Sequence, residues 1–183
     1  MGTDSGGVKL TYEDYLSIPP DGLRHEIVDG EHFVNAAPNP RHQLVTGEFY
    51  RQLATAIHDP RLGTVFISPI DVQLSENDVV QPDIVVVLAP RKHIITATRL
   101  LGAPDLVIET LSKSTKDYDR RIKKQRYERF GVPEFWIVDP DRDELEQHVL
   151  DGDEYTCLPP AGARVTTRIL PDVTVYLPRA FQR

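Results

Sequence analysis

Two apolar segments of this chain each carry a carboxylate where a hydrophobic core would not tolerate one alone. In the first segment Asp83 precedes the run Ile84–Leu88, and in the second Asp105 and Glu109 enclose the run 106–108. Continuous Val, Ile and Leu runs are typical of strands that are covered on both faces. A carboxylate at the end of such a strand loses water and keeps its charge only with a partner. Two of them on neighbouring strands would repel unless a cation lies between them, so the sequence predicts a divalent-metal site.

The spacing of the acids indicates which two form the site. Asp105 and Glu109 share one strand, so their Cα atoms are roughly 13 Å apart at about 3.3 Å per residue. Oxygen ligands lie about 2 Å from a bound ion, which makes this distance too long. Asp83 and Glu109 belong to different strands, which can lie about 4.8 Å apart. We therefore expect Asp83 and Glu109 to form the pair and Asp105 to cap the start of its strand, the alternative being that both acids are exposed at strand ends.

A lysine on the helix expected over residues 114–130 is the second candidate. At about 100° per residue, Lys123 falls between Tyr127 and Phe130 on the packed side, whereas Lys124 points to solvent. An inward ammonium needs an anion because an unpaired buried charge is costly.

Two acids could pair with Lys123. Glu109 is one, because the helix follows its strand directly. Asp119 is the other, because it lies one turn before Lys123 and would form an ordinary pair within the helix. We favour Glu109.

The elements that position these residues follow from periodicity, caps and turn residues. Besides the helix over 114–130, we expect a short helix after Thr11 and a long helix from 42 to about 58. Strands are expected over 25–28, 32–36, 65–68, 72–74, 84–88, 106–108, 133–138, 144–150 and 154–158, with one or two edge strands near the C-terminus. Residues 89–102 are expected to be basic and irregular. This order predicts an α/β (α+β) sandwich with a mixed central sheet.

The composition limits the class of protein. The 183 residues predict one domain over 8–183, preceded by a disordered lead-in over 1–7. No apolar run reaches the roughly 20 residues that span a membrane, and Cys157 is the only cysteine, which excludes a disulfide framework. We expect a cytoplasmic protein. The net charge of −7 argues against a non-specific nucleic-acid coat protein, although local basic patches and a metal could offset it in a nuclease.

Several short motifs occur together and in order. They are 25–31 (HEIVDGE), 40–43 (PRHQ), 68–72 (SPIDV), 81–83 (QPD), 103–109 (APDLVIE) and 131–139 (GVPEFWIVD). With them, the chain from residue 12 to about 155 resembles the Uma family of restriction endonucleases, within the PD-(D/E)XK nuclease superfamily. The resemblance implies a restriction-endonuclease-like fold, a mixed central β-sheet flanked by helices. It also implies Mg²⁺-dependent hydrolysis of DNA phosphodiester bonds, with Mn²⁺ as a substitute.

The resemblance assigns roles to five residues. Asp83 and Glu109 would hold the metal, together with the main-chain carbonyl of Thr110. Glu26 would be a further acidic ligand or would support the ligands from behind, although from its sequence context alone a surface salt bridge with Arg24 or His25 is equally consistent. Lys123 would orient the attacking water or stabilise the charge that develops on the phosphate.

The chain departs from the superfamily pattern at one position. The pattern places a lysine two residues after the acid, where this chain has Leu111. In the Uma family the lysine lies on the following helix, four residues before a tyrosine, and Lys123 and Tyr127 have this spacing. Lys113 lies in the connecting loop and is a poorer candidate. We expect Tyr127 to serve packing rather than chemistry.

Other side chains could contact the phosphates of a nucleic acid. His42 and Gln43 open the long helix, where backbone N–H groups attract anions; they could contact a phosphate or orient Glu26, or simply cap the helix. The exposed cations that we expect to bind the phosphate backbone are Arg99, Arg120 and Lys124.

Three functions compete at this point. The first is a Mg²⁺-dependent DNA endonuclease, expected to be a homodimer if it cuts both strands. The second is a non-catalytic nucleic-acid-binding or regulatory module that retains the nuclease fold, which the negative charge and the lack of a DNA-reading motif would suit. The third is a hydrolase of RNA or another phosphodiester. The set Glu26, Asp83, Glu109 and Lys123 favours the enzyme, because a scaffold has no physical need for buried charges.

Overall fold

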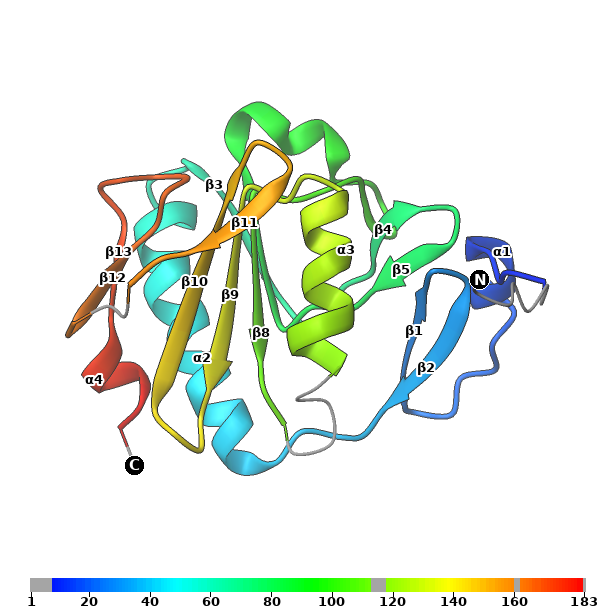
Figure 1. Cartoon of the computed structure of the whole chain (residues 1–183), viewed down its shortest axis with the longest axis horizontal. Helices are drawn as coiled ribbons and strands as arrows, with labels where there is room; N and C mark the ends of the chain where they lie inside the picture. The colour runs from blue at the N-terminus through cyan, green and yellow to red at the C-terminus, as the bar shows by residue number, and fades with distance from the viewer. Residues whose placement is uncertain (1–7, 113–117, 160–161, 183) are drawn as a thin grey trace, which may run out of the picture.

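A computed structural model of the chain describes residues 8–112, 118–159 and 162–182 (Figure 1). The expected lead-in over 1–7 therefore lies outside the described residues, as do Lys113 and the start of the helix expected from 114. The strands are β1 (Arg24–Val28), β2 (Glu31–Asn35), β3 (Gly63–Ile67), β4 (Val72–Ser75), β5 (Asp78–Val80), β6 (Ile84–Leu88), β7 (Leu100–Leu101), β8 (Leu106–Thr110), β9 (Glu134–Asp139), β10 (Glu144–Asp151), β11 (Glu154–Cys157), β12 (Arg164–Thr166) and β13 (Thr174–Tyr176).

The helices are of three kinds. The α-helices are α1 (Tyr12–Leu16), α2 (Pro40–Leu53), α3 (Lys124–Arg129) and α4 (Leu177–Ala180). Two π-helical segments, η1 (Ala54–His58) and η3 (Tyr118–Lys123), continue α2 and precede α3, and η2 (Ala89–Ile94) is a 3₁₀-helix. None of the helices in the described ranges is both long and apolar enough to cross a membrane.

The strands form a larger and a smaller sheet. The larger sheet has the order β11-β10-β9-β8-β6-β3, in which only β8 and β9 run parallel. This confirms the expected mixed central sheet. The smaller sheet has the order β2-β1-β5-β4-β7 and was not foreseen. The expected C-terminal edge strands exist as β12 and β13, but they pair with each other and not with the central sheet.

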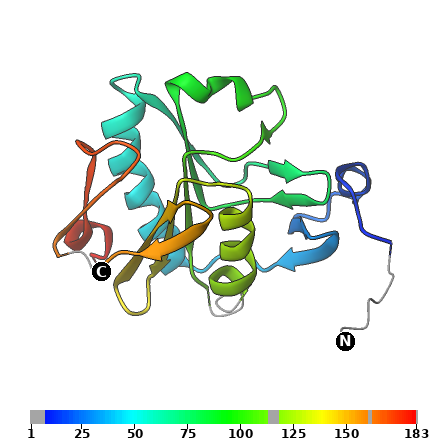
Figure 2. The same ribbon diagram turned by 45° about the horizontal axis from the view of Figure 1, so that its top comes forward.

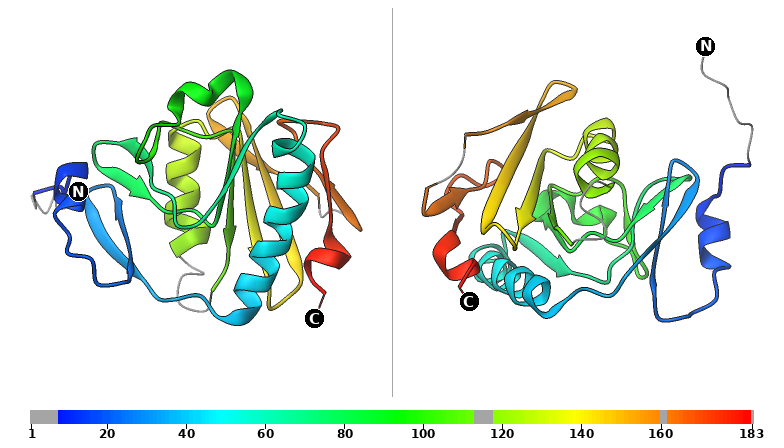
Figure 3. Two further views of the ribbon diagram at one scale, coloured as in Figure 1. Left: turned by 180° about the vertical axis from the view of Figure 1, so that it is seen from behind. Right: turned by 60° about the horizontal axis from the view of Figure 1, so that its bottom comes forward.

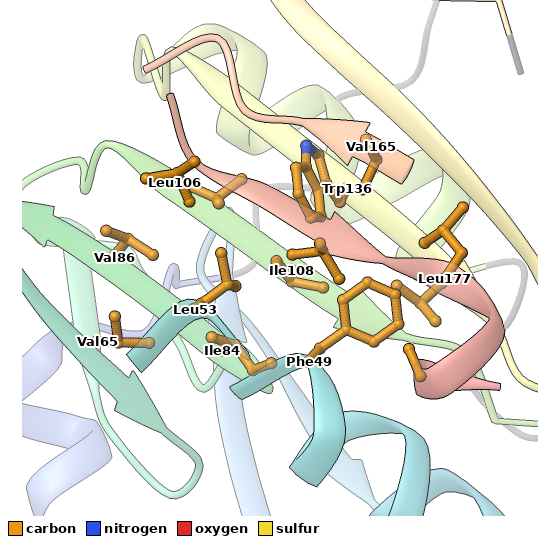
Figure 4. Packing of buried hydrophobic residues seen from close by; sticks show 14 of the residues in the cluster. Phe49, Leu53, Val65, Ile84, Val86, Leu106, Ile108, Trp136, Val165 and Leu177 are labelled. Atoms are coloured by element: carbon orange, nitrogen blue, oxygen red, sulfur yellow. The ribbon is translucent and has the colours of Figure 1, made fainter. Parts of the chain in front are cut away.

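Helices α2 and α3 cover opposite faces of the larger sheet (Figures 1 and 3). The hairpin of β1 and β2 lies beside α1, on the side of the molecule away from α4 (Figure 2). The apolar cluster beneath α2 contains Phe49, Ile84, Ile108 and Trp136 (Figure 4). A second cluster fills the α3 face and reaches the smaller sheet.

The alternation along β8 decides which way its last residues point. Leu106 and Ile108 belong to the cluster under α2, whereas Val107 belongs to the cluster on the α3 face. Because side chains alternate along a strand, Glu109 follows Val107 to the α3 face and Thr110 turns toward α2. The end of β8 can therefore present one side chain to each flanking helix.

The close approach of β3 to β6 gives a first prediction, on stability. A Cβ added to Gly63 would lie 2.6 Å from the carbonyl oxygen of Val87, so the backbone must shift. We expect Gly63→Ala to lower the free energy of unfolding by about 1–3 kcal/mol. Gly47 lies inside α2 with nothing within 4 Å of such a Cβ, and Gly47→Ala should raise the free energy by about 0.5–1 kcal/mol. Urea denaturation of both variants tests the contrast, and equal stabilities would contradict it.

Candidate active site

The register of the central sheet brings Asp83 and Glu109 to the same place. Strand β6 pairs antiparallel with β8, and Ile84 lies opposite Ile108. One further step along both chains sets Asp83 opposite Glu109. Both acids are buried, at 4% and 2% exposure. They line one small cavity of about 20 Å³, which has room for one ion or one water molecule.

Asp83 is held by three donors. Its Oδ2 accepts a hydrogen bond of 2.8 Å from the backbone N–H of Thr110 and lies 3.2 Å from Nε2 of His42. Its Oδ1 lies 3.1 Å from the guanidinium of Arg24. Burial raises the pKa of Asp83, but the hydrogen bond and charge of His42, the charge of Arg24 and the Thr110 amide outweigh it and hold the pKa below its ordinary value. Asp83 is therefore a carboxylate at neutral pH.

Lys123 bridges the two sheets at this point. Its Nζ lies 2.8 Å from Oε1 of Glu26 on β1 and 3.0 Å from Oε1 of Glu109 on β8. The side chain is 2% exposed, so these charges interact in a medium of low polarity. The lysine ends the π-helical segment η3, and such segments are frequent at functional sites. The inward orientation predicted for Lys123, and Glu109 as a partner, are confirmed.

Glu26 is completely buried. Its Oε2 accepts a hydrogen bond of 2.7 Å from the amide of Asn35, and its Oε1 accepts one of 2.7 Å from the backbone N–H of Gln81. The interpretation of Glu26 as a surface salt bridge is therefore wrong. Since Gln81 is two residues before Asp83, Glu26 also fixes the segment that carries that carboxylate.

Tyr127 does more than pack. Its ring lies 5.0 Å from that of Phe135, as a packing residue would, but its hydroxyl also donates a hydrogen bond of 2.6 Å to Oε1 of Glu109. The same oxygen of Glu109 thus accepts hydrogen bonds from the Lys123 ammonium and from the Tyr127 hydroxyl. The expectation that Tyr127 serves packing alone missed this contact.

This contact gives a second prediction. Tyr127→Phe keeps the ring and removes the hydroxyl, so Glu109 loses one of its donors. Because the acceptor is a buried carboxylate, we expect a loss of about 1.5–3 kcal/mol in the free energy of unfolding, with the fold intact by circular dichroism. Stability equal to the wild type in urea denaturation would show that the hydrogen bond adds nothing.

His42 lies against Asp83, not against Glu26. It is buried in the first turn of α2, where Asn39 caps the helix by accepting a hydrogen bond from the His42 backbone N–H. The hydroxyl of Thr46, one turn later, lies 3.4 Å from Nδ1 of His42 and is hydrogen-bonded to the Thr110 hydroxyl at 2.9 Å. This network fixes the start of α2 to the end of β8. His42 was expected either to contact a phosphate or to orient Glu26. Because it lies against Asp83, it does not orient Glu26.

Two of the cations expected at the surface are engaged within the protein. Arg120 pairs with Glu146 on β10 and lies 3.8 Å from Asp139 on β9. Arg99 donates a hydrogen bond of 2.7 Å to Gln73 and lies over the ring of Tyr12. Arg120 is therefore half-buried and paired, not the fully exposed cation that we expected, and its contact with a phosphate stays a prediction.

The remaining candidates are placed as follows. Lys124 is half-buried, and Gln43 is exposed beside His42. Asp105 lies at the other end of β8, where it accepts a hydrogen bond from the Leu88 N–H. It is therefore well away from the cavity, as the strand geometry indicated.

Arg24 is the functional candidate that sequence reasoning missed. It lies between Asp83 and the carbonyl of Gln81, and its buried Nε has no hydrogen-bond partner within the described residues. Burial lowers the pKa of Arg24, but the charges of Asp83, Glu109 and Glu26 outweigh this and raise it above its ordinary value. A signal existed in the sequence, since Arg24 is two residues before Glu26 and shares its face of β1.

The donor set suits a hard divalent ion. In the ranges that the structure describes, no three or more His, Cys, Asp and Glu side chains are grouped to hold a metal. Two carboxylates and a cavity of about 20 Å³ are present instead. Mg²⁺ is commonly bound by one or two carboxylates together with waters and the phosphates of the substrate. Asp83 and Glu109 fit that pattern.

Comparisons with known proteins agree with this geometry. A family model described as "Putative restriction endonuclease" (Uma2) matches residues 12–180. A crystal structure described as "a putative nuclease belonging to DUF820", from Anabaena variabilis ATCC 29413, is similar with a TM-score of 0.78 and 18% identity. The likeness covers 94% of this chain and 97% of that chain, and it confirms the restriction-endonuclease-like fold. A search of curated proteins found no match.

Proposed function

Because this chain belongs to the Uma2 family, whose model is described as "Putative restriction endonuclease", we propose that it is a Mg²⁺-dependent endonuclease that hydrolyses DNA phosphodiester bonds. The observation that carries the proposal is the buried charge cluster at the end of β8. There Lys123 bridges Glu26 and Glu109, and Asp83 lines the same small cavity. Buried charges are expensive, so a cluster of this kind is expected where chemistry uses it.

Asp83 and Glu109 would hold the ion, with the main-chain carbonyl of Thr110 as the third protein oxygen. The ion, once bound, would polarise the scissile phosphate and lower the pKa of a water molecule. Mn²⁺ would serve in place of Mg²⁺, because both accept the same oxygen ligands.

The protein's own cations supply the complementary charge. Lys123 lines the cavity beside Glu109, so its ammonium can hold the attacking water or stabilise the negative charge that develops on the phosphate oxygens. Arg24 also lines the cavity. The positive charge of its guanidinium, which Asp83 holds in place, would attract a phosphate oxygen and orient the substrate before attack.

One site of this kind cuts one strand. We therefore propose that the protein acts as a homodimer when it cuts a duplex, with one site facing each strand.

The crowding of the cluster favours the alternative of a module that retains the fold without cleaving. Asp83 already faces Arg24 and His42, and Glu109 already faces Lys123. A metal must share or displace these contacts, whereas a binding module could keep them.

The two functions are separated by one assay. Purified protein is incubated with supercoiled plasmid, single-stranded DNA and single-stranded RNA, in Mg²⁺, Mn²⁺ or excess chelator. The endonuclease predicts cleavage of DNA with either ion and none with chelator. Binding of DNA without cleavage under every condition would support the module, and faster cleavage of RNA than of DNA would change the substrate.

A further inference from the structure

A second, larger cavity adjoins the candidate active site. It has a volume of about 180 Å³. It shares part of its wall with the small cavity, since Arg24, His42 and Asp83 line both. Pro38 also lines both cavities. The rest of the wall comes from the start of α2 and from the end of β3 with the turn that follows it, and consists of Gln43, Thr46, Ile67, Ser68 and Pro69.

The shared wall determines what can lie in the second cavity. A strand whose phosphate lies beside Arg24 and the ion that Asp83 would hold has its next nucleotide within reach of the second cavity, because both residues line both cavities. A cavity of about 180 Å³ is too small for a base pair that stays stacked between its neighbours. The base of one nucleotide lifted out of the stack is small enough to enter it.

The lining suits the two surfaces of a nucleobase. Ile67, which is 39% exposed, and the rings of Pro38 and Pro69 offer apolar faces to a flat ring. Gln43 and Ser68 offer polar groups. In the parts of the chain that are described, neither of their side chains has a hydrogen bond to another protein group, so both remain available to a ligand. A glutamine amide carries a donor and an acceptor side by side, which is the pattern that pairs with adenine.

The cavity is also held in a fixed position relative to the acids. The backbone N–H of Ser68 donates a hydrogen bond of 2.9 Å to the carbonyl oxygen of Asp83. On the opposite wall, Thr46 is tied to Thr110 at the end of β8. A ligand in the cavity would therefore be positioned against Asp83 by the fold itself (start of α2 and end of β8 at the lower edge of Figure 1).

We propose that this cavity is a nucleotide subsite, which takes the base of one unstacked nucleotide next to the cleaved phosphate and contacts that base through Gln43. The inference rests on the proposed function and narrows its substrate class. The protein acts on single strands or on duplexes that can release a nucleotide, such as bulged or frayed DNA. Gln43 is a specificity residue in this account, with no part in the bond-breaking step.

Binding in excess chelator tests the subsite without cleavage. Fluorescence anisotropy measures the affinity of the wild type, Gln43→Ala and Leu44→Ala for a labelled single strand, a duplex with one bulged nucleotide and a fully paired duplex of the same sequence. Leu44 is the matched control, because it is the next residue on α2, is exposed and does not line the cavity. We expect the single strand and the bulged duplex to bind about 10-fold more tightly than the paired duplex, because binding of the paired duplex costs the free energy of unpairing and unstacking one base.

The Gln43 variant distinguishes a base contact from a phosphate contact. Gln43→Ala should weaken binding of the single strand and the bulged duplex by about 5–10-fold, with little change for the paired duplex, and Leu44→Ala should bind as the wild type does. Equal weakening for all three DNAs would make Gln43 a phosphate contact and overturn the subsite. Equal affinity of the wild type for all three would overturn it as well.

A parallel assay with Mg²⁺ separates the subsite from the proposed function. If the binding preferences appear but no DNA is cut, the subsite stands and the endonuclease fails. If DNA is cut but neither strandedness nor Gln43 affects binding, the endonuclease stands and the subsite fails. Failure to bind any of the DNAs would contradict the subsite directly.

Discussion

Replacing Lys123 by methionine is expected to lower the rate of DNA cleavage by about 10²–10³-fold and the free energy of unfolding by about 3–5 kcal/mol. Methionine keeps most of the length of the side chain but removes the ammonium between Glu26 and Glu109. Both carboxylates are buried, so they would be left facing each other without the cation that compensates them. Plasmid cleavage and urea denaturation measure the two effects on the same preparation.

Two further variants show whether the ion pair is the cause. Arg121→Met removes an exposed cation from the same segment, two residues earlier, and should change stability by less than about 0.5 kcal/mol. Glu26→Gln combined with Lys123→Met removes one of the two uncompensated charges. This double variant should be more stable than Lys123→Met alone, because neighbouring substitutions in one charge network are not additive. A Lys123→Met protein as stable as the wild type would contradict the pairing.

Asp83→Asn is expected to reduce cleavage by at least about 10²-fold. The substitution preserves shape but removes the charge that faces Arg24 and His42 and would bind the metal. It also affects stability in a pH-dependent way. The pKa of Asp83 is held below its ordinary value in the folded protein, so its charge stabilises the fold at neutral pH, and this contribution is lost as the pH falls through the folded pKa. The difference in free energy of unfolding between wild type and Asp83→Asn should therefore shrink in acid.

The chain offers a matched control for this variant. Asp105 is equally buried and belongs to the same strand pair, but it lies at the far end of β8, where it pairs with Arg91. Asp105→Asn should cost stability while the folded protein keeps its rate of cleavage. If Asp105→Asn and Asp83→Asn lost activity in parallel, the effect would come from general destabilisation and the role of Asp83 would fail.

Most strands of the central sheet, the acid pair at its edge and the orientation of the lysine beside it could be predicted from the sequence. The apolar runs before Leu88 and after Asp105 identified β6 and β8, and strand spacing alone selected Asp83 with Glu109. The inward orientation of Lys123 was predicted from its angular position on an α-helix. That prediction is correct even though the segment that ends at Lys123 is π-helical. The strands and the orientation of Lys123 were predictable because each depends on residues close together in sequence. The pairing of Asp83 with Glu109 needed only the further assumption that β6 and β8 are neighbours, which their register confirms.

The smaller sheet could not be predicted in the same way. Some of its strands pair although they are far apart in sequence, as β1 and β5 do. No local pattern in the sequence indicates that pairing. For this reason Glu26 became a candidate only through the family resemblance, and the role of Arg24 was missed. The ion pairs of Arg120 were missed for the same reason, because its partners lie on β9 and β10, far from it in sequence.

The most direct test of the central claim is calorimetric titration of Mn²⁺ into the wild type, Asp83→Asn and Asp105→Asn. We expect the wild type and Asp105→Asn to bind the ion with the same affinity, because Asp105 is at the wrong end of the strand to reach it. Asp83→Asn should bind it at least about 10-fold more weakly, because one of the two carboxylate ligands is gone. Binding of Mn²⁺ by Asp83→Asn with the wild-type affinity would contradict the claim that Asp83 and Glu109 hold a catalytic metal.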